Sequence, residues 1–402
     1  MIRGLPVARL QDVADLNPSL PVIPLDHEEV SFLPMSAVDA SLIDAVDAET
    51  RLYREVRKGY TPFATDDVLV AKITPCFENG KIAQAKLTRL VGFGSTEFHV
   101  VRPHVTQLDP RFLVHFLRQQ RIRKEGERRM TGSAGQRRVP AHFLANLSIP
   151  VPSLPEQWRI ANILDKADAL RAKRRAALAQ LDALTQSLFL DMFGDPATNP
   201  KGWPICPISE YVQEFQGGKS FETEAGENAP TRNRILKVSA VTGNKYRPDQ
   251  SKPVPDSYRP HQEHFVRNGD LLFSRANTAE LVGDVALVDK TPPNILLPDK
   301  LWRFVWCDPT QIEPAYVWSL FQSEHLRQEI GRRATGTSGS MKNISQEKVL
   351  GIRSMLPPIE HQRKFGAHVE KIRQISSTAK RNARVLDALF ASLQHRAFRG
   401  EL

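Results

Sequence analysis

Residues 157–193, QWRIANILDKADALRAKRRAALAQLDALTQSLFLDMF, decide the fold because a related stretch occurs again at residues 362–398. The two stretches align without a gap at an offset of 205 residues. Identical residues occur along the alignment: Gln157 and Gln362, the LDAL tetrapeptides at 181–184 and 386–389, and Phe193 and Phe398. A repeat of this kind indicates a duplicated architecture in which both copies have the same plan.

The repeat extends upstream of these stretches with small changes in offset. The aligned features are DVLVAK at 67–72 and DLLFSR at 270–275, Gly80 and Gly283, and Thr131-Gly132 and Thr335-Gly336. In each half, short β-type segments are followed by a hinge that contains prolines and then by a long helical pattern. Because proline does not fit in the interior of a helix, each helix should begin after its hinge. The hinge prolines are Pro150, Pro152 and Pro155 in the first half and Pro357 and Pro358 in the second.

Apolar residues recur at heptad spacing in both helical segments, in a row that begins at Ile160 in the first and at Phe365 in the second. A second row, three residues further on, contains Ile163, Leu170, Ala177, Leu184, Ile375 and Leu389. No local core buries rows of this length, so we expect the two helices to pack on each other as an antiparallel coiled coil. Such a rod would hold the globular parts at a fixed separation.

These patterns predict an α+β fold with a pseudo-twofold repeat, in which two globular mixed α/β domains are joined by two long helices. The predicted boundaries are 1–154 and 200–358 for the globular domains, 155–199 for the central helix and 359–402 for the distal helix.

The composition favours a soluble protein with a polyanionic partner. The net charge of +10 is typical of chains that bind nucleic acid, although charge alone is weak evidence. Cys76, Cys206 and Cys307 show no paired spacing, which disfavours a disulfide framework or a zinc knuckle and fits a reducing cytoplasm. We expect neither a signal peptide nor a membrane span.

Each globular segment ends in a loop that begins with Thr-Gly, TGSAGQRRV at 131–139 and TGTSGSMKNI at 335–344. Such loops offer backbone amides, hydroxyls and cations, the groups that hold phosphates and reach base edges. A single glycine-rich loop is most often an ordinary connection. Two loops at equivalent places in a basic, duplicated chain favour contact with DNA.

These motifs resemble the target-recognition domains of type I restriction–modification specificity subunits, and the hinges and helices resemble that family's central and distal spacers. The resemblance covers essentially the whole chain. It implies that the chain binds double-stranded DNA and that two modification subunits, which carry the adenine-N6 methyltransferase, dock on the helices. It also implies that restriction (motor–nuclease) subunits join the full enzyme, and it makes the two globular segments the target-recognition domains.

The resemblance further implies DNA-facing residues in the loop after the Asp-Leu-Leu strand and in the Thr-Gly loop. In the first domain these are Lys72, Asn79, Lys81, Thr131, Ser133, Arg137 and Arg138. In the second domain they are Ser274, Arg275, Asn277, Thr335, Thr337, Ser338 and Lys342. One departure is that Asp66-Asp67 stands where the second domain has Gly269-Asp270, which leaves the entry geometry of the first loop open.

We expect no catalytic residue, metal or cofactor in this chain. It lacks the Asn/Asp-Pro-Pro-aromatic motif and the cofactor loop of an adenine methyltransferase, and His261 and His264 have no third metal ligand nearby. The predicted function is therefore that of a non-catalytic subunit that recognises an asymmetric, bipartite DNA target.

Two alternatives remain open. The first is the recognition subunit of a related enzyme in which cleavage is fused to methylation. The second is a coiled-coil scaffold that never touches DNA, for which reversing the charge of Arg137, Arg138, Arg275 and Lys342 would leave DNA binding unchanged.

Overall fold

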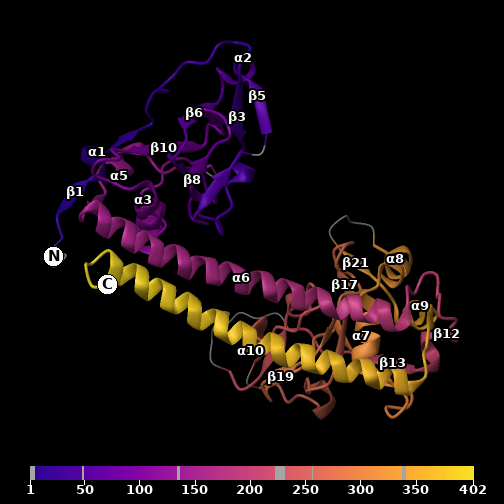
Figure 1. Cartoon of the computed structure of the whole chain (residues 1–402). Helices are drawn as coiled ribbons and strands as arrows, with labels where there is room; N and C mark the ends of the chain where they lie inside the picture. Colours follow the sequence, from indigo (N-terminus) through magenta and orange to yellow (C-terminus); the bar gives the residue numbers. More distant parts are fainter. Residues whose placement is uncertain (1–4, 48, 134–135, 222–230, 256, 337–340) are drawn as a thin grey trace. The chain divides into compact units, whose positions relative to one another are not determined.

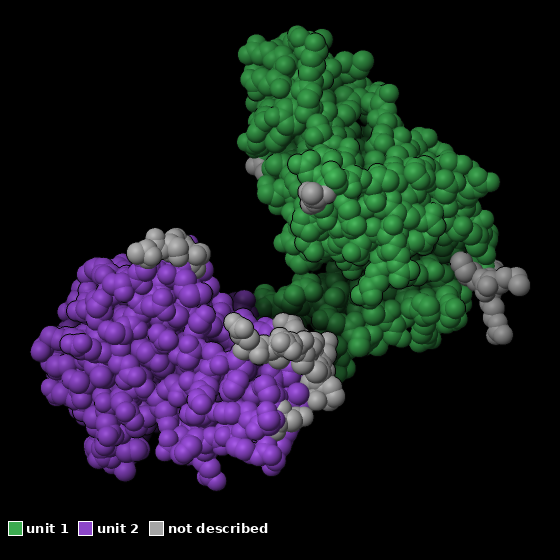
Figure 2. Space-filling view, turned by 180° about the vertical axis from the view of Figure 1, so that it is seen from behind, with its two compact units in different colours: residues 1–178, 379–402 green, residues 179–378 purple. Residues whose placement is uncertain are grey.

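The computed structural model describes residues 5–47, 49–133, 136–221, 231–255, 257–336 and 341–402. The chain divides into two compact units, residues 1–178 with 379–402 (unit 1) and residues 179–378 (unit 2) (Figure 2). Two long helices, α6 (Leu154–Phe193) and α10 (Ile359–Ala397), each contribute a segment to both units (Figure 1). Within the described ranges, no helix combines the length and the apolar character needed to cross a bilayer.

Unit 1 contains two sheets and a strand pair. The larger sheet has the order β2-β10-β7-β8-β4, formed by β2 (Ala14–Leu16), β4 (Asp44–Val46), β7 (Val68–Ala71), β8 (Ile82–Lys86) and β10 (Phe98–Pro103). The smaller has the order β5-β3-β9-β6, formed by β3 (Glu29–Leu33), β5 (Glu49–Leu52), β6 (Thr61–Ala64) and β9 (Val91–Gly94). β1 (Val7–Arg9) pairs with β11 (Ser148–Pro150). The short helices are α1 (Leu10–Val13), α2 (Tyr53–Val56), α3 (Pro110–Leu117), α4 (Gln120–Arg128), α5 (Ala141–Ala145) and the 3-10 turn η1 (Met35–Ala37).

Unit 2 is built in the same way. One sheet has the order β13-β20-β16-β18, formed by β13 (Val212–Gln216), β16 (Leu271–Ser274), β18 (Val285–Leu287) and β20 (Leu301–Trp306). A second has the order β15-β14-β19, formed by β14 (Arg234–Leu236), β15 (Ser251–Pro253) and β19 (Ile295–Leu296). The strand pairs are β12 (Ile205–Pro207) with β22 (Arg353–Met355) and β17 (Ala276–Asn277) with β21 (Lys342–Asn343). The helices are α7 (Pro314–Gln322), α8 (Glu324–Arg333), α9 (Gln346–Leu350) and the 3-10 turns η2 (Ile208–Glu210), η3 (Val238–Ala240) and η4 (Gln262–His264).

The topology of unit 1 recurs in unit 2, apart from the edge strands β4 and β6, which have no counterpart in the sheets described for unit 2. The antiparallel order β2-β10-β7-β8 corresponds to β13-β20-β16-β18, and the strand pair β1-β11 corresponds to β12-β22. In the smaller sheets, β3 is parallel to β9 and antiparallel to β5, just as β14 is parallel to β19 and antiparallel to β15. The duplicated α+β fold predicted from the sequence is therefore confirmed.

The two long helices are antiparallel where they pack within each unit. In unit 1, Ile160 and Leu164 near the start of α6 share a core with Ala397 and Phe398 at the end of α10. In unit 2, the ring of Phe193 at the end of α6 lies 5.5 Å, centroid to centroid, from that of Phe365 near the start of α10. The predicted antiparallel helix pair is confirmed.

The repeated phenylalanines at the helix ends have equivalent packing partners. Phe398 lies 4.9 Å from the ring of Phe112 on α3, and Phe193 lies 4.9 Å from the ring of Tyr316 on α7. Both α3 and α7 begin with a proline at the first turn and an acidic N-cap, a combination that starts a helix at a defined residue. Each long helix therefore begins beside one globular domain and ends in the core of the other unit.

The second apolar row predicted for the helices does not form the packed seam, so this part of the prediction is wrong. Leu170 and Leu184 are 59% and 47% exposed, and Ile375 and Leu389 are 56% and 53% exposed. The row that packs instead runs through Gln157, Leu164 and Thr185 in α6 and through Gln362, Val369 and Ser376 in α10, all of which are buried. Because this row contains polar residues, a search for hydrophobic periodicity in the sequence does not detect it.

The glutamine at the start of each copy of the repeat is buried, and its side chain joins the long helix to the hinge and to the globular domain by hydrogen bonds. The side-chain amide of Gln157 donates to the carbonyl oxygens of Gln107 and Pro152 at 2.7 and 2.8 Å, and its Oε1 accepts from Asp109 N at 2.8 Å. Gln362 donates to Pro357 O at 2.7 Å and accepts from Glu313 N at 3.1 Å. Both side chains are almost fully buried, so each long helix has a defined origin on its own domain.

Replacing Gln157 with Leu should destabilise the protein strongly, because it leaves three buried backbone groups without partners. We expect the free energy of unfolding to fall by about 2–4 kcal/mol, measured by urea denaturation with an unchanged m-value. Arg159→Gln, at an exposed position of the same helix turn, is the control and should change stability by less than about 0.5 kcal/mol. Equal stability of the Gln157→Leu and control variants would contradict the proposed role of this amide.

Candidate nucleic-acid interface

The two loops that the sequence singled out in each domain lie against each other. In unit 1, Lys72 O accepts from Val139 N at 2.8 Å, and Ile73 and Thr131 both pair with Arg138. In unit 2, Arg275 O accepts from Ile344 N at 3.0 Å. There, β17 pairs with β21, and Thr335 pairs with Asn343. The loop after the Asp-Leu-Leu strand and the Thr-Gly loop therefore form one continuous backbone ladder, which we call the loop ladder, in both units.

Glycine is required in both loop ladders. At Gly132, φ is +112° and a Cβ atom would lie 2.9 Å from Gln136 O. At Gly336, a Cβ atom would lie 2.4 Å from Met341 O. The Thr-Gly motif recurs because each loop turns back on itself with a close backbone contact that a side chain would block.

Most of the predicted DNA-facing residues of the first domain lie at the surface. Asn79, Thr131 and Ser133 are exposed, and Lys72 and Arg137 are half-buried. Lys81 is less available, because its ammonium donates to the carbonyl oxygen of Met35 at 2.9 Å.

Arg138 is held by a carboxylate that the sequence analysis missed. Its guanidinium donates through Nε and Nη2 to both carboxylate oxygens of Glu97, at 2.9 and 2.8 Å. Hydrogen bonding to Arg138 lowers the pKa of Glu97, and the charge of nearby Lys72 acts in the same direction. Glu97 lies in the turn before β10, far from Arg138 in sequence, so no local sequence pattern predicts the pair.

The second loop ladder carries fewer cations. Arg275 donates to Asp299 O at 2.8 Å, its Nη2 lies 3.6 Å from the Asp299 carboxylate, and its guanidinium lies 5.6 Å from the ring centre of Trp302. Lys342 and Asn277 are half-buried, facing each other across the β17–β21 pair, and Thr335 is exposed. The sequence analysis also missed Asp299 as the counter-charge of Arg275.

Ser274 requires a correction. It is the last residue of β16 and is 0% exposed, so it belongs to the core and presents no hydroxyl to solvent. The strand extends through this position, whereas the prediction placed it in the following loop. Thr337 and Ser338, also predicted to face DNA, lie outside the described residues.

The backbone turns in the same way before the strand that leads into each loop, although Asp66 stands where the second domain has Gly269. Asp66 has a φ of +71° and Gly269 a φ of +89°, so both residues make the same left-handed turn before their strands. The next residue is in each case an aspartate paired with an arginine of the neighbouring strand, Asp67 with Arg102 at 2.7 Å and Asp270 with Arg303 at 3.2 Å. The question raised by Asp66 is thereby answered.

No group of three or more His, Cys, Asp or Glu side chains that could hold a metal occurs among the residues that the structure describes. The arrangement that does recur is a pair of surface loops with hydroxyl, amide and cationic groups. Such groups suit contact with phosphates and base edges.

Comparison with known proteins finds relatives of one kind. The family profile described as "Type I restriction modification DNA specificity domain" matches residues 36–180. The type I restriction enzyme EcoEI specificity subunit of Escherichia coli is 28% identical over 467 aligned residues, covering 92% of this chain and 78% of that protein. This chain is therefore similar to a type I specificity subunit over nearly its whole length.

The chain also resembles further proteins of type I restriction systems. The EcoAI specificity subunit of Escherichia coli is 39% identical over 237 residues, covering 58% of this chain and 39% of that protein. The solved S subunit of a type I system from M. genitalium shares the fold, with a TM-score of 0.57, 13% identity and coverage of 98% and 97% of the two chains. A chain from a study of complex assembly in a type I R-M system gives a TM-score of 0.58 at 19% identity, covering 100% and 99%.

The Glu97–Arg138 pair predicts a pH-dependent effect on stability. Because the pKa of folded Glu97 is lowered, the pair stabilises the fold above the ordinary glutamate pKa and loses that effect as pH falls through the lowered value. Glu97→Gln should therefore lower the Tm slightly at pH 7 and have no effect in strongly acidic buffer. The effect should be small, because the pair is partly exposed and screened by salt.

The control for this experiment is Glu125→Gln, which removes the carboxylate of an exposed pair with Arg129 one helix turn away. It should leave the Tm unchanged at both pH values. A Tm loss in Glu97→Gln that persists in acid would assign the effect to packing instead of charge.

Proposed function

We propose that this chain recognises an asymmetric, bipartite sequence in double-stranded DNA, with one half-site for each globular domain. The observation that carries the proposal is the loop ladder, which recurs at equivalent positions of both units with different side chains. One ladder presents Lys72, Arg137 and Arg138, and the other presents Arg275 and Lys342. Domains with the same backbone and different side chains would bind different bases.

The proposed contacts divide by chemistry. The cations of both ladders and the backbone amides of the Thr-Gly loops would hold phosphates, and the exposed hydroxyl and amide side chains of Thr131, Ser133 and Asn79 would reach base edges. Phosphate contacts would supply most of the affinity and make it fall with salt. The functional boundaries we propose are 1–154 and 200–358 for the target-recognition domains, and 155–199 and 359–402 for the spacer helices.

The exposed apolar residues of the long helices support the docking of two copies of a partner. Leu170 and Leu389 are exposed in unit 1, and their repeat equivalents Ile375 and Leu184 are exposed in unit 2. In unit 1, Arg171 bonds to Asp387 at 2.6 Å across the helix pair, so Leu170 and Leu389 lie near the same level of the pair. Each unit thus offers an equivalent apolar surface, which we call the helix patch, to the same kind of subunit.

The partners we propose for these patches are two modification subunits, which carry the adenine methyltransferase and flip the target adenine beside each recognition domain. Restriction subunits would join them in the full enzyme. This chain would act as the non-catalytic subunit of that complex, in the cytoplasm, and its spacer helices would set the gap between the half-sites.

The decisive experiment exchanges one recognition domain. When the chain is co-expressed with its methyltransferase partner, mapping of methylated adenines across the host genome should yield a two-part motif with a constant gap. Replacing residues 200–358 with those of another family member should change one half of that motif and leave the other half and the gap unchanged. Unmodified DNA, with the complex intact, would favour the scaffold alternative instead.

Replacing Leu170 with Glu should weaken partner binding at the patch of unit 1 only. Because Leu170 is more than half exposed, the fold should keep its Tm. Native mass spectrometry should show complexes with one methyltransferase subunit in place of two. Gln186→Glu, at an exposed position of α6 on the opposite side of the helix from Leu184, is the control and should retain both copies; loss of a copy in both variants would contradict the patch assignment.

A further inference from the structure

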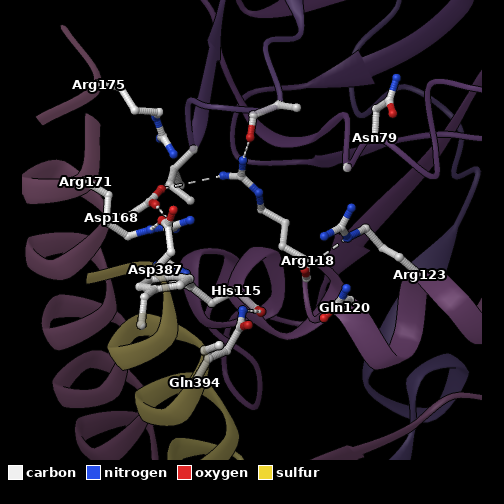
Figure 3. Close-up of a pocket in the computed structure, with 15 residues that line it drawn as sticks. Asn79, His115, Arg118, Gln120, Arg123, Asp168, Arg171, Arg175, Asp387 and Gln394 are labelled. Atoms are coloured by element: carbon white, nitrogen blue, oxygen red, sulfur yellow. Dashed lines mark hydrogen bonds and ion pairs between the residues drawn. The ribbon is translucent and has the colours of Figure 1, made fainter. Parts of the chain in front are cut away.

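Unit 1 contains a pocket that the proposed function does not use. It has a volume of about 240 Å³ and lies where α3 and α4 meet α6 and the end of α10 (Figure 3). Four arginines line it, Arg118 and Arg123 from the globular domain and Arg171 and Arg175 from α6. We call it the arginine pocket.

The carboxylates of the arginine pocket do not balance its cations. Asp168 and Asp387 both bond to Arg171, at 2.7 and 2.6 Å. Arg118 approaches Asp168 only to 4.0 Å and donates to the carbonyl oxygens of Ala40 and Leu42. Two carboxylates thus face four guanidinium groups.

The remaining two arginines have no acidic partner among the residues that the structure describes. Arg123 donates to the carbonyl oxygens of Glu78 and Arg118, at 2.6 and 3.3 Å. Arg175 is exposed at the rim, and neither side chain forms an ion pair within these ranges. Another lining residue, His115, has its Nδ1 atom buried without a hydrogen-bond partner in the described part of the chain.

The excess positive charge affects the buried arginines of the pocket. Burial lowers the pKa of Arg118, and the neighbouring cations of Arg123, Arg171 and Arg175 lower it further. Burial also lowers the pKa of Arg123. Unbalanced like charges at a partly buried site are unfavourable, and a bound anion relieves this repulsion.

The equivalent place in unit 2 shows that the fold does not need these arginines. At the repeat offsets, the positions of His115, Arg118 and Arg171 are taken by Ser319, Gln322 and Ser376 in unit 2. Arg327, the equivalent of Arg123, pairs with Asp284 at 3.0 Å. Unit 2 thus forms the same helix arrangement with two of these arginines replaced by neutral residues and a third paired with a carboxylate.

We propose that the arginine pocket binds a phosphate group, with Arg175 as a direct donor and Arg118 and Arg123 as supporting charges. Guanidinium groups suit this ligand because their N–H donors match phosphate oxygens in geometry and charge. The phosphate comes either from a free phosphate ester or from the DNA backbone. Asn79, in the loop that follows β7, also lines the pocket and connects it to the first loop ladder. The pocket consists of residues of unit 1 alone. Binding of a free phosphate ester does not depend on the proposed function, whereas a contact with the DNA backbone rests on it.

The test compares the full-length chain with two variants that remove one positive charge each. Arg175→Gln removes a rim donor that forms no ion pair among the described residues, and Lys173→Gln removes an exposed cation of the same helix that does not line the pocket. Inorganic phosphate, added at constant ionic strength, should raise the Tm of the wild type and of Lys173→Gln. Arg175→Gln should bind phosphate about tenfold more weakly, the loss expected for one charge-assisted hydrogen bond.

A second measurement distinguishes the sources of the phosphate. If the DNA backbone occupies the pocket, Arg175→Gln should weaken target binding by the chain–methyltransferase complex and reduce the salt slope by about one. If a free phosphate ester is the ligand, the variant should lose phosphate binding and keep its DNA affinity. Unchanged phosphate response together with unchanged DNA affinity and salt slope in Arg175→Gln would overturn the proposal.

Discussion

A buried side-chain amide at the start of each long helix is the constraint on which both units depend. Gln157 and Gln362 bond to hinge carbonyls and to the N-cap residues of α3 and α7, which fixes the start of each long helix on its own domain. The opposite helix ends are fixed by Phe193 and Phe398, which pack on equivalent rings of α7 and α3. Fixing each helix at both ends lets the seam between them contain polar residues such as Thr185 and Ser376.

This fixed scaffold separates stability from recognition. The loop ladders rest on backbone pairs and on glycines whose positions recur in both units, whereas the side chains they carry differ. Ion pairs such as Glu97 with Arg138 anchor individual cations without affecting the rest of the ladder. Loop sequences can therefore vary while the backbone that presents them stays the same.

Features determined by local chemistry could be predicted from the sequence. The hinge prolines and the repeated glutamine predict helix starts near Leu154 and Ile359, where the structure has them. The Thr-Gly motifs indicate loops because their glycines meet a backbone requirement. The family resemblance implied which loops would carry function, and the structure adds that the two loops of each domain are neighbours.

What could not be predicted depends on contacts between distant residues. The counter-charges Glu97 and Asp299 and the burial of Ser274 follow from strand neighbours that no local pattern identifies. The true helix seam was hidden because residues such as Thr185 and Ser376 are polar and are buried only through tertiary partners. The arginine pocket was missed for the same reason, since its residues come from five separate segments.

The aromatic cluster of unit 2 sets a condition on which segments can replace residues 200–358. Tyr316 belongs to the segment between the spacers, whereas Phe189, Phe193 and Phe365 belong to the helices that would stay behind. An incoming segment with a small residue at that position would leave a void beside the rings of Phe189 and Phe193. Hybrid chains that fold should therefore come from donors with an aromatic residue at the position of Tyr316, whichever bases those donors recognise.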